Sequence, residues 1–479
     1  MFLTLSVQKN VNMKFKQFRL IIPLFAVIFL ASCLSTDDTT YSENPTFVSL
    51  TFADNDSIPD LSSADFTLEW DELLDDSVIV NLDSLPYQTR IDSVNPTFTF
   101  QSTGAKLLYY QNDDVLDSVY LTGTDTIDFT NVVKIKNYAA DVIHLRTYPI
   151  KVNVHQVSSE LYIWNKVSDN IDNHNALNQK AVYFNDLVFY YLKNNTANYA
   201  YVSANGYDWS SKTITGLPSN CTFSDLNIIG SIIYATAADN KIYSSADGLN
   251  WTPKVQFTDY TFVSLLCTLN SNLCAVVKLN SDQNYYFANS INGEFSDATV
   301  NQQIKYNFPI SDFTSISFKS RTGKSKAMII GGKSADGTTL KTNWNTENGT
   351  YWIDFSIENK TLDTLATGAS VISYDDKLFL FGVRNDSTVL TSHYKVSIDE
   401  GFSWHKPDTA YNVLPEEYLI RNYTSAIVFN PMDYDETITY TSDQVTNSNR
   451  IFLFGGKTAT QNLSDIWTGK LNRKGFLLQ

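Results

Sequence analysis

The chain has 479 residues, and its 51 Asp and Glu outnumber its 35 Lys and Arg, so its net charge is −16. A chain of this sign repels nucleic acid and anionic lipid surfaces, and we expect no nucleic-acid partner. Its length exceeds what a single hydrophobic core usually supports and predicts two or more domains.

Residues 1–32 have the pattern of an export signal, with Met13 as the better start. From Met13 the chain reads "MKFKQFR", then the apolar run "LIIPLFAVIFLA", then "SCLS". A basic start, a short apolar run and a small-residue cleavage region are typical of such a signal. The apolar run is too short to span a bilayer comfortably as a permanent helix. Without these residues, which hold four basic and no acidic side chains, the net charge is −20.

The residues Leu30-Ala31-Ser32-Cys33 resemble the lipobox of bacterial lipoproteins. The resemblance implies cleavage before Cys33 and a lipid on it, which would anchor the chain in the outer membrane. An ordinary secretory signal with a chance cysteine is the alternative. Residues 33–44 are polar and predict a flexible tether. Their Asp37-Asp38 pair resembles the acidic signal of surface-displayed Bacteroidota lipoproteins, and a solvated linker is the alternative.

Residues 45–158 predict an Ig-like β-sandwich. Short β-branched or aromatic segments such as "TFVSLTF", "SVIVNL" and "PTFTF" are separated by Asn, Asp, Gly and Ser. This is the pattern of strands joined by turns, and the whole chain is therefore expected to be all-β. Helical periodicity is weak; the best short candidates for helices are 170–182 and 413–420.

Two segments of this region carry a family resemblance. "DSLPY" (83–87) and "YPIKVNVHQV" (148–157) resemble an uncharacterised lipoprotein family of gut Bacteroidota, a domain of unknown function. The resemblance implies that this domain precedes a propeller with kelch-like and Asp-box-like blades. It implies no activity.

Residues 159–479 repeat one layout six times at intervals of about 40–60 residues. Each repeat has an apolar strand, a second strand, a turn with Gly and an aromatic residue, as in "LNIIGSIIYATA" followed by "KIYSSADGLNWTP". That interval is the length of one four-stranded blade. The repeats predict a six-bladed propeller, with seven blades as the rival.

The recurring turn motif is predicted to be structural. "SIDEGFSW" (397–404) resembles the Asp box of secreted propellers, and "SADGLNW" (245–251) is a shorter form of it. We expect the Gly to supply positive φ, the Asp to accept hydrogen bonds within its own turn, and the Trp to fill space between strands. The residues with these roles are Asp247, Gly248, Trp251, Asp399, Gly401 and Trp404. Strands such as "FLFGV" (379–383) resemble kelch blades instead.

No catalytic residue, metal site or cofactor is predicted. Sialidases also carry Asp boxes, but their site needs three Arg around a carboxylate, and the Arg of this region lack that context. The five His have no metal-binding spacing, and no nucleophile elbow is present. Cys267 and Cys274 flank a predicted turn and could face each other across a hairpin, although small buried apolar residues are the favoured interpretation.

Binding is the predicted function. A long insertion at 430–449 contains Tyr434 and Tyr440, aromatic candidates for the rim of a ligand site, with a simple excursion of the chain as the alternative. The sequence predicts a module for a glycan or an outer-membrane protein partner. The alternatives are a polysaccharide-acting enzyme that uses channel loops and a structural subunit of an outer-membrane uptake complex.

Overall fold

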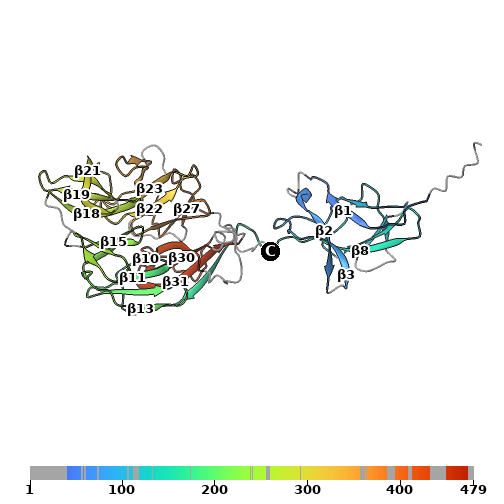
Figure 1. The fold of residues 1–479 in the computed structure, drawn as a ribbon, viewed down its shortest axis with the longest axis horizontal. Coiled ribbons are helices and arrows are strands. Elements are labelled where there is room, and N and C mark those ends of the chain that lie inside the picture. Colours follow the sequence, from blue (N-terminus) through green and yellow to red (C-terminus); the bar gives the residue numbers. More distant parts are fainter. Residues whose placement is uncertain are drawn as a thin grey trace, which may run out of the picture. The chain divides into compact units, whose positions relative to one another are not determined.

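The computed structural model describes residues 40–472 except 56–57, 59–60, 73–74, 105–106, 112–117, 132, 173, 238, 240, 255–258, 292, 357–361, 363, 386–393, 408–412 and 432–448. The chain divides into two compact units, Met1–Gln156 and Val157–Gln479, shown in Figure 1. Within the described ranges there is no α-helix, and none of the chain there could cross a membrane as a long apolar helix. Both helix candidates are wrong, because part of 170–182 forms a strand and 413–420 consists of turns and irregular chain.

The described residues of the first unit form two sheets. One pairs β1 with β4, and the other has the order β2-β3-β8-β7-β5-β6, in which only the β3–β8 pairing is parallel. A short 3₁₀ turn, η1 (Leu61–Ser63), precedes β2. The strands are β1 (Phe47–Phe52), β2 (Phe66–Asp71), β3 (Asp76–Asn81), β4 (Pro96–Phe100), β5 (Leu107–Gln111), β6 (Val119–Tyr120), β7 (Val133–Tyr138) and β8 (Leu145–Lys151).

The two sheets of the first unit share one apolar core, which includes Phe52 from β1 and Ile135 and Ile150 from the larger sheet. The two segments that carry the family resemblance lie side by side, joined by a parallel bridge between Leu85 and Val154. Leu85 donates a backbone hydrogen bond to the Asn153 carbonyl and accepts one from the His155 N–H, both at 2.9 Å. The distant segments "DSLPY" and "YPIKVNVHQV" therefore form one structural element.

The described residues of the second unit form six sheets, each named here by its innermost strand. The strands are β9 (Tyr162–Ser168), β10 (Asn178–Phe184), β11 (Leu187–Lys193), β12 (Asn198–Ser203), β13 (Ser210–Lys212), β14 (Cys221–Ile229), β15 (Ile232–Ala237), β16 (Ile242–Ser245), β17 (Thr252–Pro253), β18 (Tyr260–Leu269), β19 (Asn272–Leu279), β20 (Tyr285–Ile291), β21 (Glu294–Gln303), β22 (Thr314–Lys319), β23 (Ser325–Ile330), β24 (Asn343–Thr346), β25 (Ile353–Asp354), β26 (Ser370–Tyr374), β27 (Lys377–Phe381), β28 (Lys395–Ser397), β29 (Ser425–Phe429), β30 (Arg450–Lys457) and β31 (Asn462–Leu471).

The six sheets close into a ring, which is the arrangement of a β-propeller. The inner strands contact one another in the order β10, β14, β18, β22, β26 and β29, and β29 contacts β10 again. Each neighbouring pair of sheets encloses its own apolar core. The apolar run "LVFYYL" of β11 is continuous because neighbouring residues face different cores. Tyr190 packs in the core shared with the β29 sheet, and Tyr191 packs in the core shared with the β14 sheet. Both faces of such a strand are buried.

The ring is closed by the first strand of the unit. β9 pairs with β31, so the β29 sheet has the order β29-β30-β31-β9 and combines the two ends of the unit. In Figure 1 the last strands, β30 and β31 in red, lie beside green β10 and β11. This closure ties strands about 300 residues apart and was not predicted from the sequence repeats.

Cys267 and Cys274 are partners in the β18–β19 register. Both are buried and free, as is Cys221. The favoured interpretation of these cysteines as small buried apolar residues is confirmed.

Candidate functional site

The turn motif of 245–251 closes the reversal after the third strand of the β14 sheet. Asp247 Oδ1 accepts hydrogen bonds from the backbone N–H groups of Leu249 and Asn250 at 2.8 and 2.7 Å. Gly248 has a φ of +76°, a conformation that favours glycine. Trp251 is 3% exposed, and its Nε1 donates to the Gly248 carbonyl at 3.2 Å. These side chains are occupied with holding the hairpin.

The motif of 397–404 has the same construction in the β26 sheet. Asp399 accepts a hydrogen bond from the Ser403 N–H at 2.8 Å, and Ser397 Oγ accepts one from the Gly401 N–H at 2.8 Å. Gly401 has a φ of +86°, and Trp404 is buried. No residue of either motif lines the hollow at the centre of the ring that is described below.

The turn glycines have a second role, which the sequence did not reveal: each lies against the preceding sheet. An added Cβ would meet a side chain of that sheet at a distance that no real Cβ tolerates without movement. The distance from the added Cβ to the nearest side-chain atom is 2.6 Å at Gly206 (to Phe429), 2.7 Å at Gly248 (to Phe189), 2.1 Å at Gly293 (to Tyr234), 2.5 Å at Gly349 (to Cys274) and 2.0 Å at Gly401 (to Met328). The absence of a side chain therefore allows neighbouring sheets to pack closely.

A cavity of about 310 Å³ lies where the inner strands begin, at one mouth of the central channel. Its walls come from the β10, β14, β22, β26 and β29 sheets. Hydroxyl and amide side chains dominate the lining, among them Asn178, Gln179, Ser224, Thr314, Ser370 and Ser425. Such a surface can exchange hydrogen bonds with a polyhydroxylated ligand.

Tyr423 is an exposed aromatic residue of this channel mouth, with 42% of its surface accessible. Its N–H donates to the Gly368 carbonyl at 2.5 Å, and its ring lies so close to Gly368 that a Cβ there would be 2.8 Å from Cε1. Gln179 Nε2 donates to the Tyr423 carbonyl at 3.3 Å. The backbone of Tyr423 has a φ of +54°, which is unusual for an aromatic residue. Its neighbours therefore hold the ring in place at the rim.

A set of equivalent polar positions, one per inner strand, surrounds the channel. At four of these positions the side chain accepts a hydrogen bond from the next sheet. The donor is the backbone N–H of the residue that comes directly after the equivalent position in that sheet. Val371 donates to Thr314 at 3.2 Å, Ala426 to Ser370 at 3.0 Å, Ala181 to Ser425 at 2.9 Å and Leu265 to Asp225 at 3.4 Å. The six equivalent residues are Lys180, Asp225, Ser264, Thr314, Ser370 and Ser425.

Lys180 and Asp225 are the charged members of this set and occupy neighbouring sheets. Burial raises the pKa of Asp225 to about 6, against the opposing effects of the Thr236 hydroxyl, the Leu265 N–H and Lys180. Burial also lowers the pKa of the Lys180 amine, and Asp225 partly offsets this. Lys180 lines the cavity and is half-buried, whereas Asp225 is 8% exposed.

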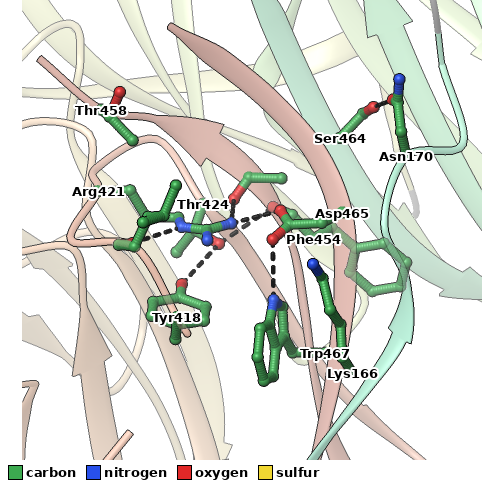
Figure 2. Close-up of polar contacts among 12 residues, drawn as sticks. Lys166, Asn170, Tyr418, Arg421, Thr424, Phe454, Thr458, Ser464, Asp465 and Trp467 are labelled. Atoms are coloured by element: carbon green, nitrogen blue, oxygen red, sulfur yellow. Dashed lines mark hydrogen bonds and ion pairs between the residues drawn. The ribbon is translucent and has the colours of Figure 1, made fainter. Parts of the chain in front are cut away.

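A buried ion pair supports the segment that carries Tyr423 (Figure 2). The Arg421 guanidinium pairs with Asp465 and stacks 4.1 Å from the Tyr418 ring centroid. Asp465 lies on β31 and Arg421 on the segment before β29, so the ion pair joins the two. Asp465 also accepts a hydrogen bond at 2.8 Å from Trp467 Nε1 of the same strand. Both charged side chains are at least 92% buried, which makes the pair costly to break from one side.

A larger hollow of about 510 Å³ lies between the turns of the β22 and β26 sheets and is lined by Tyr351, Phe355 and Phe402. Its charged groups satisfy one another, with Lys326 2.7 Å from Glu400. The channel mouth is the better candidate because its Lys180 amine forms no ion pair with a described residue, whereas Lys326 of the other hollow does.

The predicted site residues Cys33, Tyr434 and Tyr440 lie outside the described residues, as does the predicted signal. Sequence reasoning missed Tyr423 and Lys180. A signal was present at two of the inner strands, where a small polar residue precedes an apolar pair in "TGASVI" (367–372) and "NYTSAIV" (422–428).

Comparison with known proteins identifies the family and not the activity. The DUF6242 beta propeller domain matches residues 158–479, and the DUF6242 N-terminal domain, a domain of unknown function, matches residues 34–152. None of the curated proteins matches. Solved structures with a loosely similar fold include YjhT, at 11% identity and a TM-score of 0.42 over 62% of this chain and 95% of that one. Another is a DUF4623 family protein from Bacteroides eggerthii, at 11% identity and a TM-score of 0.40 over 89% and 98%. The two domain matches cover most of the chain, which therefore belongs to the DUF6242 family, with its N-terminal domain and its β-propeller.

Proposed function

We propose that this protein is a non-catalytic binding module that holds a glycan at the channel mouth, with the Tyr423 ring as the stacking surface. The observation that supports this most is the fixed, exposed ring beside a cavity of about 310 Å³ lined by hydroxyl and amide groups. Sugars present apolar ring faces and a rim of hydroxyls, so an aromatic side chain next to several hydrogen-bonding groups is complementary to them.

The lining favours binding over hydrolysis. Glycosidases generally use two carboxyl groups that flank the scissile bond. Asp312 is the one carboxylate among the described residues of the lining, and it is 2.7 Å from Lys333. A polysaccharide-acting enzyme is the competing function, and release of reducing ends from a polysaccharide panel would support it.

We further propose that the six sheets are six blades, and that the protein is displayed on the outer membrane by a lipid on Cys33. The blade number is supported by the closed order of contacts among the inner strands. The Ig-like character of the first unit stays a prediction, supported by its two sheets around one core; the parallel β3–β8 pair departs from wholly antiparallel sheets.

A second competing function is that of a structural subunit of an outer-membrane uptake complex. A protein with that function would co-purify with a transporter and show no glycan affinity.

The test is isothermal titration of the lipid-free chain with a panel of oligosaccharides. Tyr423→Ala should weaken binding about tenfold, or ~1.4 kcal/mol, because the stacking surface is lost, whereas Tyr423→Phe keeps the ring and should bind as the native chain does. Equal affinity of the Ala variant and the native chain would contradict the proposal.

A further inference from the structure

The described lining of the channel mouth has more basic than acidic side chains. Lys180 and Lys457 both line the cavity, and within the described part of the chain neither amine forms an ion pair. The other charged residue of the lining, Asp312, is paired with Lys333. This local positive charge contrasts with the net charge of −16 of the whole chain.

Lys180 also departs from the pattern of its ring position. Thr314, Ser370 and Ser425 hold hydroxyls there that accept a backbone N–H from the next sheet. An ammonium group has three donors and no acceptor, so Lys180 cannot make this contact. Lys180 is half-buried, so its amine loses part of its hydration, and no hydrogen bond to a described residue replaces it. A structural role would be served better by Ser or Thr.

Asp225 does not remove this need for a partner. It interacts with Lys180 electrostatically, yet the two form no ion pair within 4.0 Å. Its Oδ2 accepts hydrogen bonds from Thr236 and Leu265, and its buried Oδ1 has no hydrogen-bond partner among the described residues. Asp225 also does not line the cavity, whereas Lys180 does. The amine is therefore the charged group of the two that a ligand in the cavity can reach.

We infer that the ligand carries an anionic group, a uronic-acid carboxylate or a sulfate ester, which pairs with Lys180 while Lys457 adds positive charge at the rim. This deepens the proposed glycan binding and rests on it. Both anions have oxygens that accept the hydrogen bonds an ammonium offers. In a partly enclosed cavity such a pair is screened less than it would be on the surface.

The experiment compares charged and neutral forms of one glycan. The full chain is titrated with oligogalacturonate and with its methyl ester, and in a second arm with a sulfated oligosaccharide and its desulfated form. The native chain should prefer one charged form at least tenfold, and the arm in which it does so identifies the anion. Lys180→Met should remove that preference. Lys212→Met, on the exposed outer strand β13, is the matched control and should leave the affinities for the charged and the neutral form unchanged.

The outcomes separate this inference from the proposed function. If neutral glycans bind through Tyr423 and neither charged form is preferred, the inference is wrong and the glycan site stands. If no glycan binds, the glycan site is wrong, and the anion site is tested by acetic anhydride labelling of lysines read by mass spectrometry. At equal ionic strength, Lys180 should then be acetylated less in sulfate than in chloride, whereas Lys212 should be acetylated equally in both salts. Equal labelling of Lys180 in the two salts would overturn the anion site.

Discussion

The Tyr191 hydroxyl donates a hydrogen bond to the Gly248 carbonyl at 2.8 Å, and the two residues belong to neighbouring sheets of the ring. The same carbonyl accepts from Trp251 Nε1 at 3.2 Å within its own hairpin. One peptide group thus joins the turn motif to the adjacent sheet. The motif stabilises the packing between sheets as well as the hairpin in which it lies.

Replacement of Gly248 tests this packing role. Gly248→Ala would place a Cβ 2.7 Å from Phe189 at a φ of +76°, and we expect a loss of about 2–4 kcal/mol from strain and overpacking together. Gly323→Ala is the matched control, because Gly323 has a φ of +79° but open space around it, and should lose about 1 kcal/mol. Urea unfolding measures both, and equal losses would show that only the backbone conformation matters.

Asp247 should stabilise the fold above about pH 4. Burial alone would raise its pKa, but the bonds from Asn250, Leu249 and Ser245 outweigh this and hold it well below the usual range. The folded state therefore favours the ionised form, and its stabilisation disappears as the pH falls through the folded pKa. Asp247→Ala should lower the unfolding free energy by about 1 kcal/mol at pH 7 and by progressively less in acid.

Asp247→Asn is the control for that experiment, since its amide oxygen can still accept the two backbone bonds. It should lose less than the Ala variant at pH 7. A cost of Asp247→Ala that stays constant from pH 7 into acid would argue against the ionised carboxylate as the stabilising form.

Asp225 should have the opposite pH dependence. Its pKa is raised to about 6 in the folded chain, so the protonated form is favoured and the fold is weakened as the pH rises from about 4 through 6. Asp225→Asn removes the ionisation and keeps an acceptor for Thr236 and Leu265. It should be more stable than the native chain at pH 8 by on the order of 2 kcal/mol, with no difference below pH 4. Thermal unfolding at a series of pH values measures this, and a destabilised Asn variant at pH 8 would be contrary to it.

The pair between Arg421 and Asp465 should behave as a coupled unit. Arg421→Met or Asp465→Asn alone leaves a buried group without its partner, and each should cost about 3 kcal/mol. The double variant should cost clearly less than the sum, as a double-mutant cycle would show. Additive losses would mean that the two side chains contribute independently.

The sequence predicted the repeated parts of the fold well because each repeat buries the same pattern of side chains. The all-β class and the propeller followed from recurring strands and turns such as Ser-Ala-Asp-Gly at 245–248. The closure of the ring by β9 was missed, because that strand stands apart from the repeat it completes. The channel mouth was missed because Tyr423 and Lys180 lie 243 positions apart and share no local motif.

The most direct test of the account is a crystal structure of the chain with a bound oligosaccharide. A sugar ring stacked on Tyr423 at the channel mouth, within hydrogen-bonding distance of the surrounding hydroxyl and amide groups, is the predicted result. A sugar bound instead in the hollow beside Tyr351 and Phe402, or on the first unit, would contradict it.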